Sequence, residues 1–327
     1  MSHLSMGRQV PLLVVAAGLL LAPAVLSEAV LPELTRLVVL IGAAMSLNIL
    51  VGTTGLISMG QGIFLGFGAY VVAIATIRYG VSYWTAGLLC LVVVIPLAML
   101  IGLTSLRARH LFFALLTMAI GQVAFVAVAL SYSLTGGDDG LVGVVVPAWL
   151  EGDLAQHFFA TGVAIAVCIG LLGLLGSPFG MMLRAVRDNS ARVASLGGNP
   201  KVFELVAFTL AGTVGTIFGV LYAATEGGAD PHLFSWTTSA TLLIMVALGG
   251  RSLFAGPIIG GVLLEIPRAY AQVHTSHADL VVGAIVIVCA VMFPEGIGPP
   301  LYSALRKTWA RRRAGPRDAN SHLPVEK

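Results

Sequence analysis

The sequence is poor in charge. Only 10% of its 327 residues are Asp, Glu, Lys or Arg, against about 25% in soluble domains. The hydrophobic share is 57%, and so few charges could not shield that much apolar surface from water. This composition excludes an ordinary soluble domain and predicts that lipid surrounds most of the chain. The 39 glycines fit that prediction, because small residues let helices approach closely in a bilayer.

Motifs for catalysis are missing as well. The few lysines do not form a G-x-x-x-x-G-K-[ST] phosphate loop, and neither H-E-x-x-H nor G-x-S-x-G occurs. The net charge of +3 is modest, and the basic residues form no stripe that would suit nucleic acid. We therefore expect a protein that is not an enzyme, with no catalytic residue, no cofactor of its own and no nucleic-acid partner.

Candidate metal ligands are sparse too. His274 and His277 lie three residues apart beside Asp279, but no further ligand accompanies them, so we predict no metal site. The cysteines lack C-x-x-C spacing and lie in apolar runs, where free cysteine behaves as a small hydrophobic residue. They are Cys90, Cys168 and Cys289.

Long apolar segments predict an all-α, polytopic membrane protein, since a transmembrane helix needs about 20 mostly apolar residues. Ten segments reach or approach that length: 10–27, 36–55, 59–77, 83–105, 111–132, 157–175, 203–225, 238–249, 254–270 and 280–293. The eighth and tenth are short, which predicts broken, tilted or re-entrant helices. We expect residues 1–305 to form one transmembrane domain and residues 306–327 a basic cytoplasmic tail.

Basic residues predict the orientation of these spans, because short cytoplasmic loops carry an excess of Lys and Arg. The 104–110 and 176–202 loops are basic, whereas the 133–156 and 226–237 loops contain acidic residues and neither Lys nor Arg. This alternation predicts a multi-pass membrane protein with both termini in the cytoplasm. The 10–27 segment also resembles a signal peptide, but it lacks a clean cleavage site, so we expect it to be retained.

The basic loop between the sixth and seventh spans reads SPFGMMLRAVRDNSARVASLGGNP over 177–200. Ser177 as N-cap and Pro178 as first residue predict a helix start, and Gly197 suits a helix end. Arg184 and Asp188 are spaced to pair across one turn. An apolar stripe follows helical spacing at Leu183, Val186, Val193 and Leu196. The pattern predicts an amphipathic helix at the cytoplasmic surface, either a connector held by anionic lipid or a docking element.

Glycines crowd the stretch VGTTGLISMGQGIFLGFGAY (51–70) and predict a broken helix. Such a break is tolerated at membrane depth where protein or water covers the backbone, and it often marks a translocation site. Gly62 and Gly66 also form a G-x-x-x-G packing pattern, so a path and tight packing both remain open. The polar residues predicted for the path are Asn48, Ser58, Gln61, Thr117 and Gln122.

Glu265 lies inside the apolar run GPIIGGVLLEIP. A carboxylate within a membrane is a functional candidate. It precedes Arg268 by three residues, however, so we expect an ion pair near the interface rather than a transport role.

Four stretches together carry a resemblance to a known family. They are LNILVGTTGLISMGQGIFLGFGAY, RHLFFALLTMAIGQV with LTGGDDGLVGV, PFGMMLRAVRDNSARVASLGGNPKVFELVAFTLAGTVGTIFGVLYA, and ATLLIMVALGGRSLFAGPIIGG. In this order they resemble the LivM-type permease subunits of branched-chain amino-acid ABC importers over nearly the whole chain. Two departures, Asp188-Asn189-Ser190 and Arg251-Ser252, leave substrate and partner details open.

The resemblance implies a type II ABC-importer permease that moves branched-chain or other hydrophobic amino acids. Its implied partners are a second, LivH-like permease subunit, two cytoplasmic ABC ATPase subunits that use ATP and Mg, an external binding protein, and membrane lipid. The 177–200 segment would then be the coupling helix that docks on the ATPase. The positions that match the family pattern are Gly180, Arg184, Ala185, Arg187, Asp188, Ala194, Gly197 and Pro200.

Three alternative functions differ from this one in cargo or in mechanism. A urea or short-chain amide permease of the same family uses very similar subunits, and the sequence does not separate the two. A self-powered secondary transporter or channel would need buried ionisable residues, which are scarce here. A membrane-embedded enzyme would need a cluster of His or carboxylate residues near one interface, and the sequence has none.

The orientation gives a first testable prediction. An epitope tag inserted at 137–141 is expected to bind antibody added outside intact spheroplasts, because that loop is acidic and external. A tag after Arg313 is expected to bind antibody only after permeabilisation. The opposite pattern would invert the topology.

Overall fold

The computed structural model describes residues 30–275 and 277–300, together with Gly18, Pro23 and Ser303. The basic tail, 306–327, and almost all of the predicted first span, 10–27, lie outside the described residues.

Six described helices are long and apolar enough to cross a membrane. They are α2 (Leu31–Asn48) with its continuation η2 (Ile49–Thr54), α3 (Gln61–Tyr79), α4 (Tyr83–Ser105), α5 (Leu111–Leu130), α7 (Asp153–Gly176) and α9 (Pro200–Thr225). Three more helices coincide with the last three predicted spans: α10 (Trp236–Gly249), α11 (Gly256–His274) and α12 (Ala278–Met292). The all-α, polytopic architecture is therefore confirmed.

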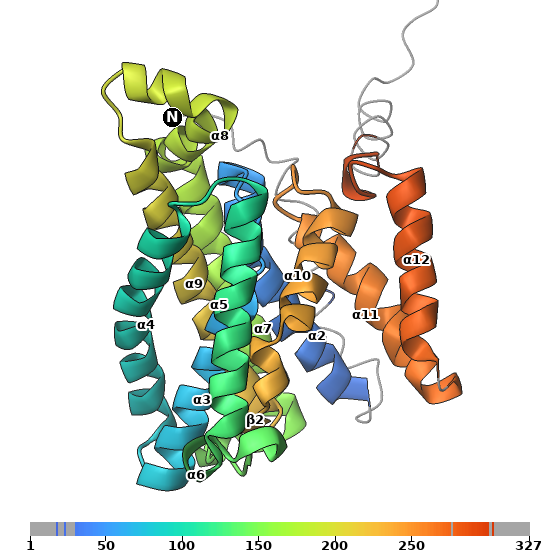
Figure 1. Ribbon diagram of the computed structural model, residues 1–327. Coiled ribbons are helices and arrows are strands. Elements are labelled where there is room, and N and C mark those ends of the chain that lie inside the picture. Colours follow the sequence, from blue (N-terminus) through green and yellow to red (C-terminus); the bar gives the residue numbers. More distant parts are fainter. Residues whose placement is uncertain (1–17, 19–22, 24–29, 276, 301–302, 304–327) are drawn as a thin grey trace, which may run out of the picture.

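The two kinds of loop lie at opposite ends of the bundle. Figure 1 shows α8 (Pro178–Ser195) at one end, beside the connection between α4 and α5, and α6 (Tyr132–Thr135) with β2 (Gly228–Ala229) at the other. We call the end with α8 and residues 105–110 the basic end. The end with residues 131–152 and 226–235 is the acidic end. The separation of charge agrees with the predicted alternation of loops.

The acidic end contains short structure that the sequence analysis treated as loops. The strand β1 (Leu141–Val142) pairs antiparallel with β2, with Leu141 opposite Ala229. A Cβ atom on Gly228 would lie 2.4 Å from the Leu141 carbonyl oxygen, so the pairing needs glycine there. Three short 3-10 turns complete this end: η3 (Gly137–Asp139), η4 (Ala148–Leu150) and η5 (Pro231–Phe234). The pairing fastens the two acidic connections to each other.

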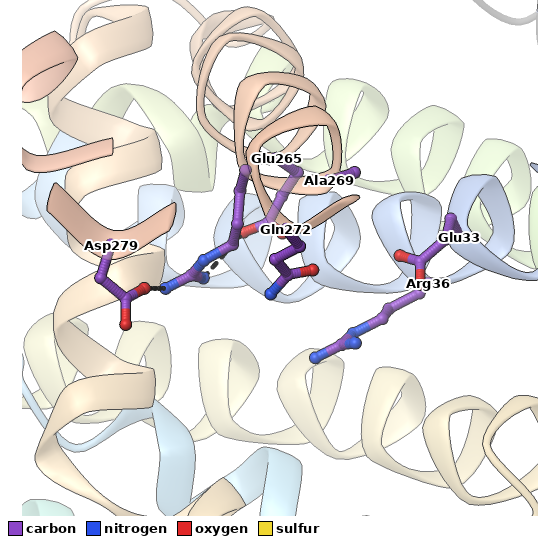
Figure 2. A pocket seen from close by; sticks show the side chains of 7 residues that line it. Glu33, Arg36, Glu265, Ala269, Gln272 and Asp279 are labelled. Atoms are coloured by element: carbon purple, nitrogen blue, oxygen red, sulfur yellow. Dashed lines mark hydrogen bonds and ion pairs between the residues drawn. The ribbon is translucent and has the colours of Figure 1, made fainter. Parts of the chain in front are cut away.

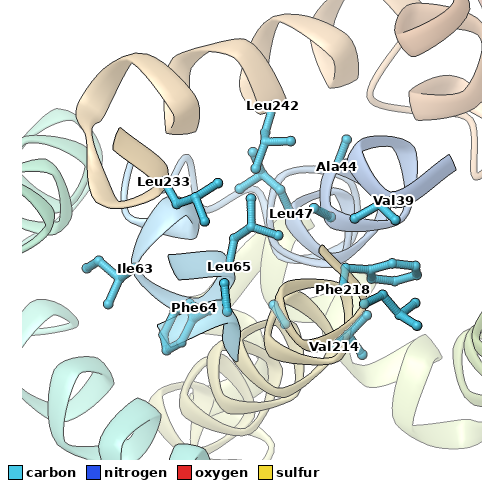
Figure 3. Close-up of a cluster of buried hydrophobic side chains, with 14 of the residues drawn as sticks. Val39, Ala44, Leu47, Ile63, Phe64, Leu65, Val214, Phe218, Leu233 and Leu242 are labelled. Carbon is cyan, nitrogen blue, oxygen red and sulfur yellow. The ribbon is translucent and has the colours of Figure 1, made fainter. Parts of the chain in front are cut away.

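Helix α2 lies at the centre of the fold, with 89% of its most apolar window buried. Its side chains, such as Leu47, meet Phe64 of α3 and Phe218 of α9 in one cluster of buried apolar groups (Figure 3). This arrangement places the central helix, which carries the predicted break, in contact with protein rather than lipid.

Glycines allow α3 and α9 to touch along their backbones. A Cβ atom on Gly219 would lie 2.1 Å from the Leu65 carbonyl oxygen, and one on Gly68 would lie 2.4 Å from that of Thr216. Such distances leave no room for a side chain. The glycine content that the composition showed therefore serves close packing on this pair of helices.

Apolar side chains cover the outer faces of α4, α5 and α12. Leu88 and Val92 of α4, Phe112 and Val123 of α5, and Val291 of α12 are each at least 66% exposed. Water would penalise so large an apolar surface, and lipid does not. These faces are the expected covering of a bundle whose solvent is a bilayer.

The α3–α9 contact gives a stability prediction. Gly219→Ala is expected to destabilise the protein by about 1–3 kcal/mol, the usual cost of overpacking a core, because the new methyl group meets the Leu65 carbonyl. The matched control is Gly173→Ala on α7, where an added Cβ meets nothing within 4 Å. Thermal unfolding in detergent measures both variants, and equal midpoints would contradict the proposed packing.

Candidate functional site

The predicted broken helix is confirmed. Helix α2 continues as the π-helix η2, which ends where Gly55 adopts the left-handed conformation, with φ 74°. The chain then runs without helix to Gly60, and α3 begins at Gln61. We call residues 49–60 the helix break. Single π-helical turns occur often at functional sites, which makes this break the first place to look for one.

Side chains from other helices satisfy the backbone of the helix break. The Met59 amide donates to Thr117 Oγ1 of α5 at 3.1 Å. The Gly62 amide, just past the break, donates to Ser239 Oγ of α10 at 3.0 Å. In a bilayer, non-helical backbone is tolerated where protein or water supplies such partners. The break is therefore held by at least two neighbouring helices.

Most of the predicted path residues gather at this break. Asn48 precedes it, Ser58 lies within it and Gln61 follows it, while Thr117 contacts it from α5. Ser58, Gln61 and Thr117 are fully buried. The structure thus brings four of the predicted residues together inside the protein, and their role in transport stays a prediction. Gln122 is placed further along α5.

Two buried side-chain amides flank the break, and each has a carbonyl oxygen without a hydrogen-bond partner among the described residues. Gln61 Nε2 donates to Ser46 Oγ at 2.5 Å and to the Ala211 carbonyl of α9 at 3.0 Å. Asn48 Nδ2 donates to the Leu253 carbonyl at 3.2 Å. Among the described residues, Gln61 Oε1 and Asn48 Oδ1 have no hydrogen-bond partner. Buried polar atoms of this kind call for a partner, and each oxygen can accept a hydrogen bond from an ammonium group or from water.

Helix α8 has the predicted bounds but not the predicted continuity. Pro178 is its first residue, and Gly197, with φ 86°, follows its end, as expected. Ser177 occupies the N-cap position, yet its hydroxyl donates back to the Leu174 carbonyl at 2.6 Å and does not cap the helix. At Asn189 the backbone is extended, with φ −161° and ψ 91°. The expectation of one unbroken helix was therefore wrong.

Asn189 explains the kink. Its Oδ1 accepts a hydrogen bond from the Arg192 amide at 2.9 Å, which caps the helical segment that follows. Asparagine is among the best N-cap residues, so the sequence carried a signal for this second helix start. α8 consequently consists of a first segment, 178–188, and a second segment, 190–195.

The apolar stripe of α8 is confirmed in part. Leu183, Val186 and Val193 are buried, but Leu196 is 82% exposed. The reason is that the helix ends at Ser195, so residue 196 no longer follows the helical face. Ala185 and Ala194 are exposed.

Two arginines of α8, Arg184 and Arg187, bind helix ends, and the predicted Arg184–Asp188 pair is wrong. Arg184 Nη1 donates to the Leu175 carbonyl, in the last turn of α7, at 3.0 Å. Arg187 instead pairs with Asp188, at 3.0 Å between Nη2 and Oδ1. Its Nη1 donates to the Gly52 carbonyl, in the last turn of η2, at 2.7 Å. Carbonyls in a last turn lack intrahelical donors and carry partial negative charge, so they are favourable acceptors for an arginine side chain.

Two of the remaining predicted positions have clear structural roles. A Cβ atom on Gly180 would lie 2.2 Å from the Leu175 carbonyl oxygen, so glycine lets α8 turn sharply away from α7. Pro200 is the first residue of α9, a position where the missing amide of proline costs nothing.

A charged cavity of about 280 Å³ opens near the acidic end, between α2, α11 and the start of α12. Figure 2 shows the side chains that line it, among them Glu33, Arg36, Glu265 and Asp279. The predicted Glu265–Arg268 pair is confirmed at 3.4 Å, and Arg268 also pairs with Asp279 at 3.3 Å. Apart from Ala269, the residues that line this cavity are charged or polar, and none of them belongs to the helix break.

Two further side-chain interactions near this end were not predicted from the sequence. Arg36 Nε lies 3.8 Å from Glu226 Oε1. Burial raises the pKa of Glu226 above its usual value, and Arg36 offsets only part of that rise. His274 Nδ1 bonds to the Tyr270 carbonyl at 2.9 Å. Within the described ranges, no group of three His, Cys, Asp or Glu residues could hold a metal ion.

Comparisons with known proteins identify a family of transport permeases. The profile of the family described as "Branched-chain amino acid transport system / permease component" matches residues 31–290. The high-affinity branched-chain amino acid transport system permease protein LivM of Escherichia coli (strain K12) is 27% identical over 293 residues, 81% of this chain and 68% of that protein. Its counterpart in Salmonella typhimurium (strain LT2) gives the same figures.

A third relative is less similar in sequence. The probable branched-chain amino acid transport permease protein LivM of Methanocaldococcus jannaschii is 24% identical over 211 residues, 60% of this chain and 61% of that protein. No solved structure matches the chain.

The helix break gives a prediction of its own. Thr117→Val is expected to lower stability by about 1–3 kcal/mol, the cost of an unsatisfied buried group, because the Met59 amide loses its acceptor. Thr104→Val is the control, since the Thr104 hydroxyl bonds to carbonyls of its own helix, at Leu100 and Ile101. Thermal unfolding of both variants in detergent is the measurement. An equal effect of the two changes would show that Thr117 does not support the break.

Proposed function

Because this chain belongs to the family of branched-chain amino-acid transport permease components, we propose that it imports branched-chain or other hydrophobic amino acids as the membrane subunit of an ABC transporter. The observation that carries the proposal is the family match over residues 31–290, which includes both the helix break and α8. The relatives named for branched-chain amino acids supply the substrate class.

The partners follow from what the chain does not carry. It has no phosphate loop, so ATP hydrolysis with Mg belongs to two cytoplasmic ATPase subunits. An external binding protein delivers the amino acid, and a second, LivH-like permease subunit completes the membrane path. The basic end faces the cytoplasm of a bacterial inner membrane, since Lys and Arg are retained on that side. Both termini lie there as well.

The mechanism needs a contact that differs between two conformations, because an effector shifts an equilibrium only through a difference in interaction free energy. We assign this contact to α8, and its position at the basic end and the exposed Arg192 of its second segment support the assignment. The helix break is the element placed to respond, since it interrupts the central helix. Asn48 and Gln61 beside the break are the amides that would meet a passing ammonium or carboxylate group, with Ser58, Thr117 and Gln122 further polar groups of the path.

The test is transport by the reconstituted complex. Proteoliposomes that contain this chain, its partner permease and the ATPases are expected to accumulate radiolabelled leucine when the binding protein and ATP are supplied. The purified chain alone is expected to hydrolyse no ATP. ATP-dependent accumulation of urea without leucine would assign the amide cargo instead. Leucine uptake that needs an ion gradient and no ATPase would contradict the importer.

A further inference from the structure

Arg187 joins two elements that are 135 residues apart in the chain. Its Nη1 donates to the Gly52 carbonyl at 2.7 Å, so a side chain of α8 is bonded directly to the π-helical turn. The stem of the same side chain packs on Gly55, where an added Cβ would lie 3.0 Å from Arg187 Cγ. Gly55 also has a positive φ. Arg187 therefore contacts η2 and its C-terminal end in two ways. Its guanidinium donates a charged hydrogen bond to the Gly52 carbonyl, and its aliphatic stem packs on Gly55, which has no side chain to block it.

A carboxylate fixes the guanidinium from the opposite side. Asp188 Oδ1 accepts from Arg187 Nε at 3.1 Å and pairs with Nη2 at 3.0 Å. The Asp188 side chain is 67% exposed and that of Arg187 is 38% exposed. The three groups form a chain that runs from the surface of the basic end, through Asp188 and Arg187, to the backbone of Gly52.

The kink in α8 separates this chain from the second segment. Asn189 caps the helix that carries Arg192, and it follows Asp188 directly. Arg184 and Arg187 in the first segment bind inward, to carbonyls of α7 and η2. Arg192 in the second segment is exposed. The two segments thus differ in their contacts: the first is bonded to α7 and η2, and the second leaves Arg192 exposed.

The π-helical turn at Gly52 also packs closely against Asn48 and against the connection between α10 and α11. A Cβ atom on Gly52 would lie 2.7 Å from the Arg251 carbonyl oxygen and 2.8 Å from Asn48 Oδ1. Asn48 in turn donates to the Leu253 carbonyl. Both carbonyls belong to the connection between α10 and α11. A displacement of Gly52 by Arg187 therefore presses on Asn48 and on that connection, because closely packed groups transmit strain.

We propose that Arg187 is a positioning residue that transmits movement of α8 to the helix break through its bond to the Gly52 carbonyl, while the second segment of α8 forms the docking surface. This inference rests on the proposed function, since it concerns how work done by the ATPase reaches the path. Arg187 itself contacts neither nucleotide nor substrate. Its effect is on the coupling between hydrolysis and transport.

The experiment measures three quantities in the full reconstituted complex: recovery of the ATPase with the membrane subunits, the rate of ATP hydrolysis, and leucine transported per ATP hydrolysed. For Arg187→Ala we expect recovery and hydrolysis close to wild type. Transport per ATP is expected to fall about tenfold or more, the loss that follows removal of a hydrogen bond to a charged group. Arg187→Lys should recover part of the ratio, because an ammonium group can still donate to the Gly52 carbonyl.

Two further variants make the outcome specific. Arg78→Ala removes an exposed arginine at the far end of α3 and should leave all three quantities unchanged. Asp188→Asn keeps the bond to Gly52 and should lower transport per ATP less than Arg187→Ala does. A merely structural role would lower hydrolysis and transport together, or reduce recovery of the complex.

Any of these results would overturn the inference: an unchanged ratio in Arg187→Ala, loss of the ATPase from that variant, or no recovery with lysine. Failure of the proposed function is distinguishable, because it would show in the wild-type complex as ATP hydrolysis without leucine transport. If the wild type carried another solute, the ratio would be measured with that solute.

Discussion

The constraint on which this structure depends is that a broken helix in an apolar surrounding must find partners for its backbone. Unsatisfied amides and carbonyls cost several kcal/mol each in lipid. Side chains from other helices supply these partners. Thr117 of α5, Ser239 of α10 and Arg187 of α8 each form a hydrogen bond with the backbone at or beside the break. Because of this requirement, the π-helical turn, the polar residues and α8 lie in one region.

Glycine supplies the space in which these bonds form. On α9, a Cβ atom at Gly215 would lie 2.5 Å from Gln61 Nε2, and the Gln61 amide reaches the Ala211 carbonyl across the same surface. On α10, the Ser239 hydroxyl meets Gly62, where a Cβ atom would lie 3.0 Å from it. Close backbone approach and polar contact are thus one feature of the packing. The two interpretations of the glycine-rich stretch, path element and tight packing, are compatible in this fold.

Features set by local sequence pattern, such as helix spans, could be predicted from the sequence. Contacts between residues far apart in the chain could not. The span 83–105 matches α4, and the broken helix was expected from its glycines. The partners of Arg184 and Arg187 could not be predicted, because the carbonyls they bind come from α7 and from a turn 135 residues away. The β1–β2 pairing also joins distant segments. The kink in α8 is a feature that the sequence analysis missed but could have predicted, because asparagine is a preferred N-cap residue and Asn189 lies at the kink.

The central claim is that α8 and the helix break move as one body. Structures of the assembled complex by electron cryomicroscopy, without nucleotide and with bound ATP, test it most directly. We expect the hydrogen bond between Arg187 and the Gly52 carbonyl in both states, with α8 and residues 49–54 displaced together relative to α9. If α8 instead shifted while the π-helical turn stayed fixed against α9 and the hydrogen bond was lost, the account would be contradicted.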